Sequence, residues 1–231
     1  MNGLFIVFEG GDGCGKTTQV ERAARWLSQF DGEVMLTREP GGTQLGSQIR
    51  ELLLHGGHVD PRAEALLFAA DRAHHVATDI RPALECGAIV VCDRYIDSSV
   101  AYQSGGRGLA EYDIEDLSAW ASGDLLPDLT IVLDLDVAVA DARRSARSSA
   151  DRIEAEGAQW RQSIRETFLR RAARTPDRYR VVDADGAPDE VAQRVRSVRA
   201  TTALNKTREL STEELRQEQR PAAPAHSGAS L

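Results

Sequence analysis

The chain has 231 residues, of which 42% are hydrophobic and 28% charged, and its formal net charge is −8. This length suits one domain with a substantial core, and the composition excludes wholesale disorder. No apolar run approaches the roughly 18 residues of a membrane span, and an acidic chain is an unusual general binder of nucleic acid, so we expect neither partner. Three scattered cysteines without a CxxC pair exclude a disulfide framework, and no basic leader precedes the first apolar run, so we expect a cytoplasmic protein.

Apolar runs bounded by turn residues predict strands that alternate with helices. In chain order we expect strands at 4–9, 33–37, 88–92, 129–134 and 179–183, and helices at 17–29, 49–54, 62–85, 113–122, 137–147, 153–174 and 187–200. This alternation predicts an α/β fold in which a five-stranded parallel sheet carries helices on both faces. From residue 201 onward the chain has no aromatic residue, Ile or Val, so we expect one domain over 1–200 and a disordered tail over 201–231.

The first predicted strand leads into a glycine-rich segment that matches the phosphate-loop pattern G-x-x-x-x-G-K-[ST]. Glycines let successive backbone N–H groups surround a phosphate, and the N-terminus of the following helix favours the anion. We therefore expect a nucleoside triphosphate with Mg²⁺, with Lys16 on the β- and γ-phosphates and Thr17 on the metal ion. The residues expected to bind it are Gly10, Gly11, Asp12, Gly13, Cys14, Gly15, Lys16, Thr17 and Thr18.

Two residues of this loop carry separate expectations. Lys16 is one of only two lysines among 28 basic residues, which indicates that its position needs a compact ammonium; codon bias is the alternative. Cys14 lies close to a predicted helix start, where the pKa of a thiol falls, so we expect it to be sensitive to alkylation. Phosphoryl transfer needs no thiol nucleophile, so we expect no catalytic role for it.

Charged residues follow the predicted strands at the sheet edge where ligands of parallel α/β proteins bind. Arg38 and Arg94 can converge there on one phosphate, because a guanidinium binds phosphate oxygens bidentately; a surface ion pair is the alternative for each. Phe68 and Arg72 lie four residues apart on one helix face. They can offer an aromatic plane and a hydrogen-bond donor to a base, although the residue type alone favours core packing for Phe68.

Four segments taken together resemble the thymidylate kinase family: residues 8–18, 37–43, 67–72 and 93–103. Residues 127–130 and 151–154 resemble the same family, and the resemblance extends in order over 4–200. It implies a P-loop nucleoside monophosphate kinase fold with a lid at about 143–152. It also implies transfer of the γ-phosphate of Mg-ATP to dTMP, giving dTDP in dTTP biosynthesis, and a homodimer.

The resemblance also assigns roles to individual residues. Phe68 would stack on thymine, Arg72 would bond its exocyclic oxygen, and Tyr102 would lie against the 2′ position of the sugar. Asp93 would support Mg²⁺, with Glu9 as a further candidate. The remaining acceptor-side residues are Asp12, Arg38, Arg94, Ser99 and Gln103.

The catalytic arginine is expected in the lid, because loop positions 12–14 hold none. Arg147 is the first candidate and Arg143 the second, and a solvated loop is the alternative reading of this segment. The resemblance also implies a cis peptide bond between Glu39 and Pro40. The alternatives for the whole chain are a kinase for another nucleotide or a deoxynucleoside, a nucleotide switch or ATPase without an acceptor, and an interaction module.

Overall fold

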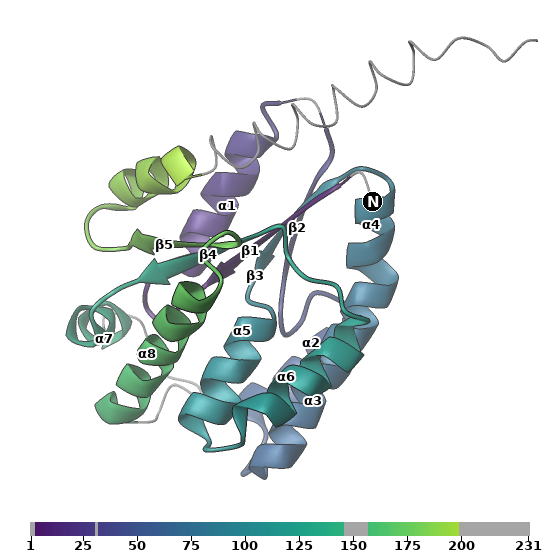
Figure 1. The fold of residues 1–231 in the computed structure, drawn as a ribbon, viewed down its shortest axis with the longest axis vertical. Helices are drawn as coiled ribbons and strands as arrows, with labels where there is room; N and C mark the ends of the chain where they lie inside the picture. The colour runs from purple at the N-terminus through teal and green to yellow at the C-terminus, as the bar shows by residue number, and fades with distance from the viewer. Residues whose placement is uncertain (1–2, 31, 146–156, 199–231) are drawn as a thin grey trace, which may run out of the picture. The chain divides into compact units, whose positions relative to one another are not determined.

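The computed structural model describes residues 3–30, 32–145 and 157–198. Its centre is a sheet of five parallel strands, which lie in the order β2-β3-β1-β4-β5 (Figure 1). The strands are Leu4–Glu9 (β1), Val34–Arg38 (β2), Ile89–Asp93 (β3), Leu129–Asp134 (β4) and Tyr179–Asp183 (β5). All five predicted strands are confirmed, and β2 and β3 begin and end one residue later than predicted.

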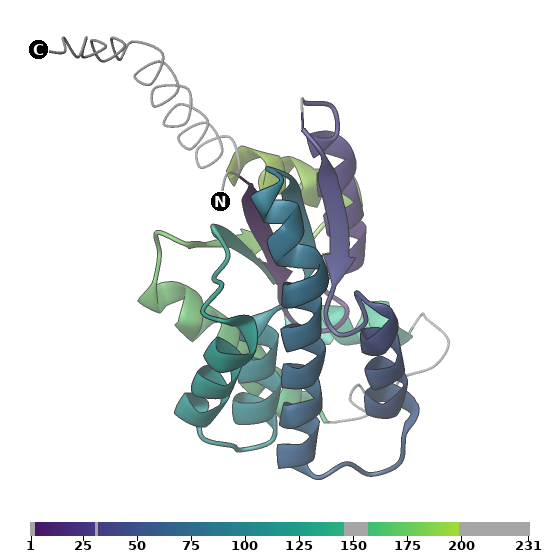
Figure 2. The same cartoon turned by 90° about the vertical axis from the view of Figure 1, so that its right-hand side faces the viewer.

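Helices connect the strands, as the α/β pattern predicts. They are Lys16–Leu27 (α1), Gln44–His55 (α2), Pro61–His75 (α3), Arg81–Glu85 (α4), Ile96–Ser99 (α5), Glu111–Ser122 (α6), Val137–Ser145 (α7) and Ala158–Arg174 (α8), with a further helix from residue 188. The predicted helix over 62–85 is present as α3, a π-helical segment Val76–Ile80 (η1) and α4, which together form one continuous column (Figure 2).

Two helical regions differ from the prediction. The helix expected at 49–54 begins five residues earlier, because the Thr43 hydroxyl accepts a hydrogen bond from the Gly46 N–H at 2.9 Å and caps it. The chain over α5 and the π-helical Val100–Gly106 (η2) was not predicted to be helical. Its last glycines pack closely on α8: a Cβ on Gly106 would lie 2.6 Å from Trp160 Nε1. Contact with a distant helix therefore shapes this segment.

Two buried clusters lie on one face of the sheet, because the strand residues of both point the same way in its register, and α1 covers the other face. Phe5 and Val7 of β1 and Val90 of β3 pack on the column of α3, η1 and α4. A second cluster joins β4 and β5 to η2 and α8, and includes Tyr102 and Phe168. In Figure 1, α1 and α4 lie on opposite sides of the strands, which confirms the predicted arrangement of helices. Because η2 contributes side chains to both clusters, it packs on α8 through one and on the first cluster, with α3, η1 and α4, through the other.

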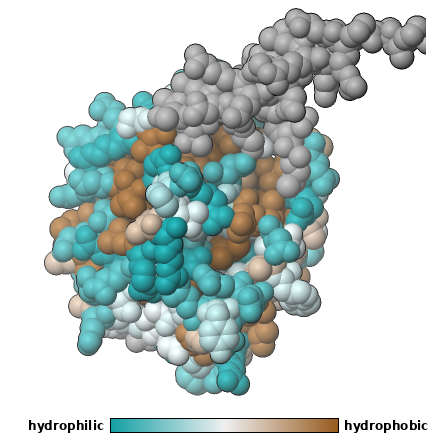
Figure 3. All heavy atoms as spheres, in the orientation of Figure 1, coloured by the Kyte–Doolittle hydropathy of each residue, from teal (hydrophilic) through white to brown (hydrophobic). Residues whose placement is uncertain are grey.

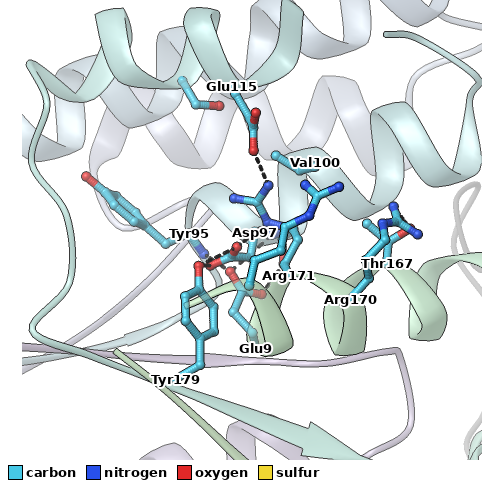
Figure 4. Close-up of polar contacts among 12 residues, drawn as sticks. Glu9, Tyr95, Asp97, Val100, Glu115, Thr167, Arg170, Arg171 and Tyr179 are labelled. Carbon is cyan, nitrogen blue, oxygen red and sulfur yellow. Dashed lines mark hydrogen bonds and ion pairs between the residues drawn. The ribbon is translucent and has the colours of Figure 1, made fainter. Parts of the chain in front are cut away.

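A buried ionic network fixes α5 against α8 (Figure 4). Arg171 of α8 donates to Asp97 Oδ1 at 2.5 Å and also pairs with Glu115 of α6. The Tyr179 hydroxyl donates to the same Asp97 carboxylate, at 2.8 Å from Oδ1. Asp97 is almost fully buried, and these partners satisfy its carboxylate. The network anchors the segment that directly follows Asp93 and Arg94.

The surface carries both hydrophobic and hydrophilic residues. On the face shown in Figure 3, hydrophobic residues are exposed in separate patches between hydrophilic ones. None of the helices in the described ranges combines the length and the hydrophobicity that crossing a bilayer requires. The predicted tail over 201–231 and residues 146–152 of the predicted lid lie outside the described residues, so both stay predictions.

Candidate active site

The carboxyl ends of β2 and β3 and the phosphate loop that follows β1 line one cleft of about 560 Å³. In the register of the sheet, Asp93 lies opposite both Phe8 of β1 and Arg38 of β2, so the residues that follow these strands come together. Most of the predicted site residues line this cleft: Asp12, Gly13, Gly15, Lys16, Thr17, Thr18, Arg38, Phe68, Arg72, Asp93, Arg94, Ser99, Tyr102 and Gln103.

The phosphate loop has the backbone that its glycines predict. Gly13 and Gly15 have φ angles of 86° and 90°, a region that only glycine adopts readily. The carbonyl of Ala140 lies 2.6 Å from where a Cβ on Gly13 would stand, so the loop is also packed closely from behind. Lys16 donates to the carbonyls of Gly10 and Gly11, at 2.9 and 2.8 Å. The loop therefore holds the ammonium group within its own curve.

Thr17 and Asp93 form a pair that fits a magnesium ion. The Thr17 hydroxyl donates to Asp93 Oδ2 at 3.0 Å. The other oxygen, Oδ1, is buried and has no hydrogen-bond partner in the part of the chain that the structure describes. No group of three or more His, Cys, Asp or Glu in the described ranges could hold a metal ion. Mg²⁺ is commonly held by one or two protein oxygens, water and substrate phosphates, which is what this pair allows.

Arg94 is held from several sides at the centre of the cleft. It has a φ of 71°, an unfavourable conformation for a residue with a side chain, which an active site retains only when its surroundings enforce it. Its guanidinium pairs with Asp12, donates to Ser98 Oγ at 3.0 Å and stacks on the Tyr102 ring at 5.0 Å. The Tyr102 hydroxyl in turn donates to Asp12 Oδ2 at 2.6 Å.

The charge of Asp12 depends on this arrangement. Burial works to raise the pKa of Asp12, but the charges of Arg94 and Lys16 outweigh it and lower that pKa below its usual value. Asp12 is therefore a carboxylate at neutral pH, and it accepts from both Arg94 and Tyr102. The negative charge of Asp12 thus stands near both Lys16 of the phosphate loop and Arg94.

The Arg38 side chain, unlike that of Arg94, is not held by neighbouring groups. It is exposed and lines the same cleft, and its guanidinium has no hydrogen bond or ion pair with any of the described residues. A guanidinium without a partner on the wall of an anion-binding cleft is free to bind an incoming phosphate. Arg38 and Arg94 line the same cleft, and their convergence on one phosphate stays a prediction.

Arg72 is largely committed to the protein. Its side chain is 1% exposed, and it donates from Nε to Glu39 Oε2 at 2.9 Å, from Nη1 to Ser118, and from Nη2 to the Tyr95 carbonyl and Ser99. A guanidinium has five N–H donors, and these bonds use four of them. One Nη1 N–H is left for the cleft that Arg72 lines. The half-buried Phe68 lines the same wall.

The sequence did not reveal the residues that hold Arg72. Glu39 lies at the end of β2, Ser118 on α6 and His75, which bonds to Glu39, on α3. Glu39 belongs to the 37–43 segment of the resemblance, but nothing in the sequence pairs it with Arg72, and no motif contains Ser118 or His75. The peptide bond between Glu39 and Pro40 is cis, as the sequence predicts.

Both carboxylate oxygens of Glu9 bond to the protein, and Glu9 does not line the cleft. It is fully buried, and its Oε1 accepts from the Tyr95 and Ser98 N–H groups at 2.8 and 3.1 Å, while Oε2 accepts the Ser98 hydroxyl at 2.6 Å. Burial and the neighbouring charge of Asp97 raise the pKa of Glu9 to about 7. These bonds tie Glu9 to the turn that follows Asp93 (Figure 4), and its part in a magnesium site stays a prediction.

Cys14 is also placed differently from the expectation. Its side chain is buried, and burial raises the pKa of the thiol despite the nearby charge of Lys16. A buried thiol with a raised pKa is a poor nucleophile. Burial and the raised pKa argue against the expected sensitivity of Cys14 to alkylation, which stays a prediction.

The lid arginines are described only in part. Arg143 of α7 donates to the carbonyls of Ala184 and Gly186, at 3.1 and 3.2 Å, so it holds the loop that follows β5 and does not line the cleft. Arg147 lies outside the described residues. Its assignment stays a prediction, and the observed contacts of Arg143 make it the less suitable of the two.

Comparison with known proteins agrees with this site. Residues 8–195 match the family model described as thymidylate kinase. The chain is 55% identical over 199 residues to a thymidylate kinase of Clavibacter sepedonicus, covering 85% of this chain and 94% of that relative. It is 55% identical over 196 residues to one of Bifidobacterium longum, covering 83% and 94%, and 51% identical over 186 residues to one of Pseudomonas fluorescens, covering 80% and 89%. The chain belongs to the thymidylate kinase family.

Proposed function

We propose that this chain transfers the γ-phosphate of ATP to dTMP, giving ADP and dTDP, in the supply of dTTP for DNA synthesis. The observation that carries this function is the shared cleft: the phosphate loop with Lys16 lines one part of it, and Arg38 and Arg94 line another. Two anions can therefore meet in one site. A nucleotide switch or a simple ATPase needs no second set of arginines facing the loop.

On the donor side, Lys16 binds the β- and γ-phosphates, and the loop N–H groups surround them. Thr17 and Asp93 would hold Mg²⁺, which would supply positive charge near the transferred group. The buried Asp93 Oδ1, which lacks a hydrogen-bond partner among the described residues, supports this assignment. Burial of an oxygen that no donor satisfies is costly, and a cation would offset that cost.

On the acceptor side, Arg94 and Arg38 bind the phosphate of dTMP, and Phe68 stacks on the base. Arg72 directs its remaining N–H at the exocyclic oxygen. Gln103 contributes a buried Oε1 without a hydrogen-bond partner in the described ranges, which suits an N–H of a pyrimidine. The ring of Tyr102 lies under Arg94 and limits the space at the sugar. Ser99 supports Arg72 at 3.0 Å.

The reaction needs no general base, because the acceptor phosphate is already anionic. Catalysis then depends on alignment of the two phosphates, on neutralisation of their charge and on exclusion of water. Arg94 is suited to act on both sides, since it donates to the Gly10 carbonyl of the phosphate loop at 3.3 Å. We expect it to contact the transferred group as well as the acceptor.

A coupled assay of ADP release tests this function with a panel of nucleoside monophosphates. ADP release should require dTMP, should fall strongly with purine monophosphates, and should stop when EDTA removes Mg²⁺. Equal ADP release with and without dTMP would identify an ATPase or switch instead. Preference for another monophosphate would leave the kinase chemistry in place and reject the assignment of the base site.

We also propose that Arg147 supplies positive charge to the transferred phosphoryl group. The phosphate loop has Asp12, Gly13 and Cys14 where an arginine would otherwise stand, so the charge has to come from elsewhere. Arg147→Ala should lower kcat roughly 10²–10³-fold with little change in the KM for dTMP. Arg143→Ala is the comparison, and a larger loss of kcat there would transfer the catalytic role to Arg143.

A homodimer is the assembly that we propose. Helices α2, α3 and α6 pack side by side and expose large apolar side chains, among them Leu52, Leu66, Tyr112 and Trp120, with Trp120 82% exposed. Exposed apolar surface on neighbouring helices is typical of an interface. Analytical ultracentrifugation should give twice the chain mass, and Trp120→Glu should shift the equilibrium to the monomer. A monomer at all concentrations would reject this assembly.

A further inference from the structure

A buried histidine lies directly behind the acceptor side of the cleft. His75 is fully buried, sits three residues after Arg72 on α3 and does not line the cleft. Its Nδ1 lies 3.1 Å from Glu39 Oε1, and its Nε2 lies 2.7 Å from Thr37 Oγ1. Gly42 closes over the ring, since a Cβ there would stand 2.5 Å from Nε2. The reaction described above makes no use of this side chain.

The chemistry of its neighbours fixes the hydrogen-bond directions. Glu39 is paired with Arg72, a permanent cation, at 2.9 Å, so its carboxylate only accepts hydrogen bonds. His75 must then carry its proton on Nδ1 and donate it to Glu39. In the neutral ring, Nε2 is an acceptor and takes the hydrogen of the Thr37 hydroxyl. Every member of this buried chain thus has a partner.

Through Glu39, His75 is linked to two residues of the acceptor site, Arg72 and Arg38. The second oxygen of Glu39 accepts from Nε of Arg72, and this ionic bond orients the guanidinium together with the bonds from Nη1 and Nη2. Only one N–H of Arg72 remains for a ligand, so the place of the Glu39 carboxylate affects where that N–H points. Glu39 also follows Arg38 in the chain, and its own N–H donates to the Asp93 carbonyl at 2.9 Å.

We propose that His75 is a positioning residue for recognition of the acceptor base, because its Nδ1–H locks the Glu39 carboxylate that orients Arg72. The proposal rests on the proposed function, since it concerns how dTMP is recognised in the same cleft. His75 touches no substrate. Its effect should appear in binding and discrimination of the acceptor and not in handling of ATP.

Two matched variants separate the two ring nitrogens. The amide N–H of asparagine reaches the place of Nδ1, whereas the amide of glutamine reaches the place of Nε2. His75→Gln should raise the KM for dTMP about 10-fold, the effect of losing one buried hydrogen bond to a charged group, with kcat and the KM for ATP nearly unchanged. His75→Asn should keep the KM for dTMP close to that of the unmodified enzyme.

Base discrimination gives a readout that a merely structural role would not move. A guanidinium N–H selects the C4 carbonyl of dTMP against the C4 amino group of dCMP, so His75→Gln should reduce the preference for dTMP over dCMP. His75→Asn should preserve that preference. An equal effect of both variants, or a parallel rise in the KM for ATP, would overturn the proposal.

A double-mutant cycle keeps the test decisive if His75→Gln folds poorly. Glu39→Gln alone should raise the KM for dTMP in the same way, and adding His75→Asn or His75→Gln should cause little further loss, because both residues act through Arg72. Fully additive losses would overturn the proposal. If the unmodified enzyme showed no activity with dTMP, the proposed function itself would fail, which is distinct from an active enzyme that ignores His75→Gln.

Discussion

Replacing Lys16 by alanine is expected to lower kcat about 10³–10⁴-fold, because the ammonium is the only cation that the phosphate loop itself contributes to the γ-phosphate. Its Nζ lies 2.9 and 2.8 Å from the carbonyls of Gly10 and Gly11, within the curve that receives the phosphates. Binding of dTMP should persist, since Arg38 and Arg94 remain in place. Steady-state kinetics and calorimetric titration with dTMP measure the two effects separately.

Lys16→Arg is the matched control for charge. A guanidinium is planar and larger than an ammonium, and it cannot lie between the two loop carbonyls without moving the loop. We therefore expect Lys16→Arg to be nearly as inactive as Lys16→Ala. Recovery of more than about a tenth of the activity in Lys16→Arg would show that positive charge alone suffices, and the interpretation of the lone lysine in an arginine-rich domain would be wrong.

Arg94→Ala is expected to lower kcat/KM for dTMP about 10³–10⁴-fold, the second large effect. The change removes the central guanidinium of the cleft and leaves Asp12 without its ion-pair partner. The freed carboxylate then repels both phosphates, and the pKa of Asp12 should rise toward the value that burial favours. Kinetics with dTMP and ATP varied in turn should show a lower kcat and a higher KM for dTMP.

Arg38→Ala provides the comparison for Arg94. Arg38 is exposed and lacks partners among the described residues, so its removal should cost binding of dTMP about 10-fold and leave kcat almost intact. The double variant Arg94→Ala with Asp12→Asn should recover part of the lost activity, because it removes the unpaired charge. No recovery would mean that the main contribution of Arg94 is direct contact with the phosphates.

The secondary structure followed closely from local pattern. Strands β1, β4 and β5 match the predicted residues, because buried parallel strands are continuous apolar runs between turn residues. The early start of α2 was also present in the sequence, as a capping threonine at position 43. The segment over α5 and η2 was not predictable in this way, since its conformation depends on the approach of Gly105 and Gly106 to α8.

The proximity of the main site residues was likewise predictable. Arg38 and Asp93 end β2 and β3, Arg94 follows β3, and Lys16 ends the loop after β1; the carboxyl ends of parallel neighbours meet at one edge of the sheet. What the sequence did not contain was the direction of each polar side chain. Glu9 lies at the same edge, yet both its oxygens turn to the segment after Asp93.

The amino-acid sequence by itself determined the phosphate loop, the order of strands and helices, and the set of cations at the strand ends, because each depends on residues that are neighbours in the chain. Only the tertiary structure decided which polar groups form hydrogen bonds within the protein and which face the cleft. Arg72 and His75 of α3 are buried together with Glu39, which follows β2, and burial raises the pKa of the Cys14 thiol. Burial and hydrogen-bond partners arise from contacts between distant segments, and these set the charge and the orientation of a side chain.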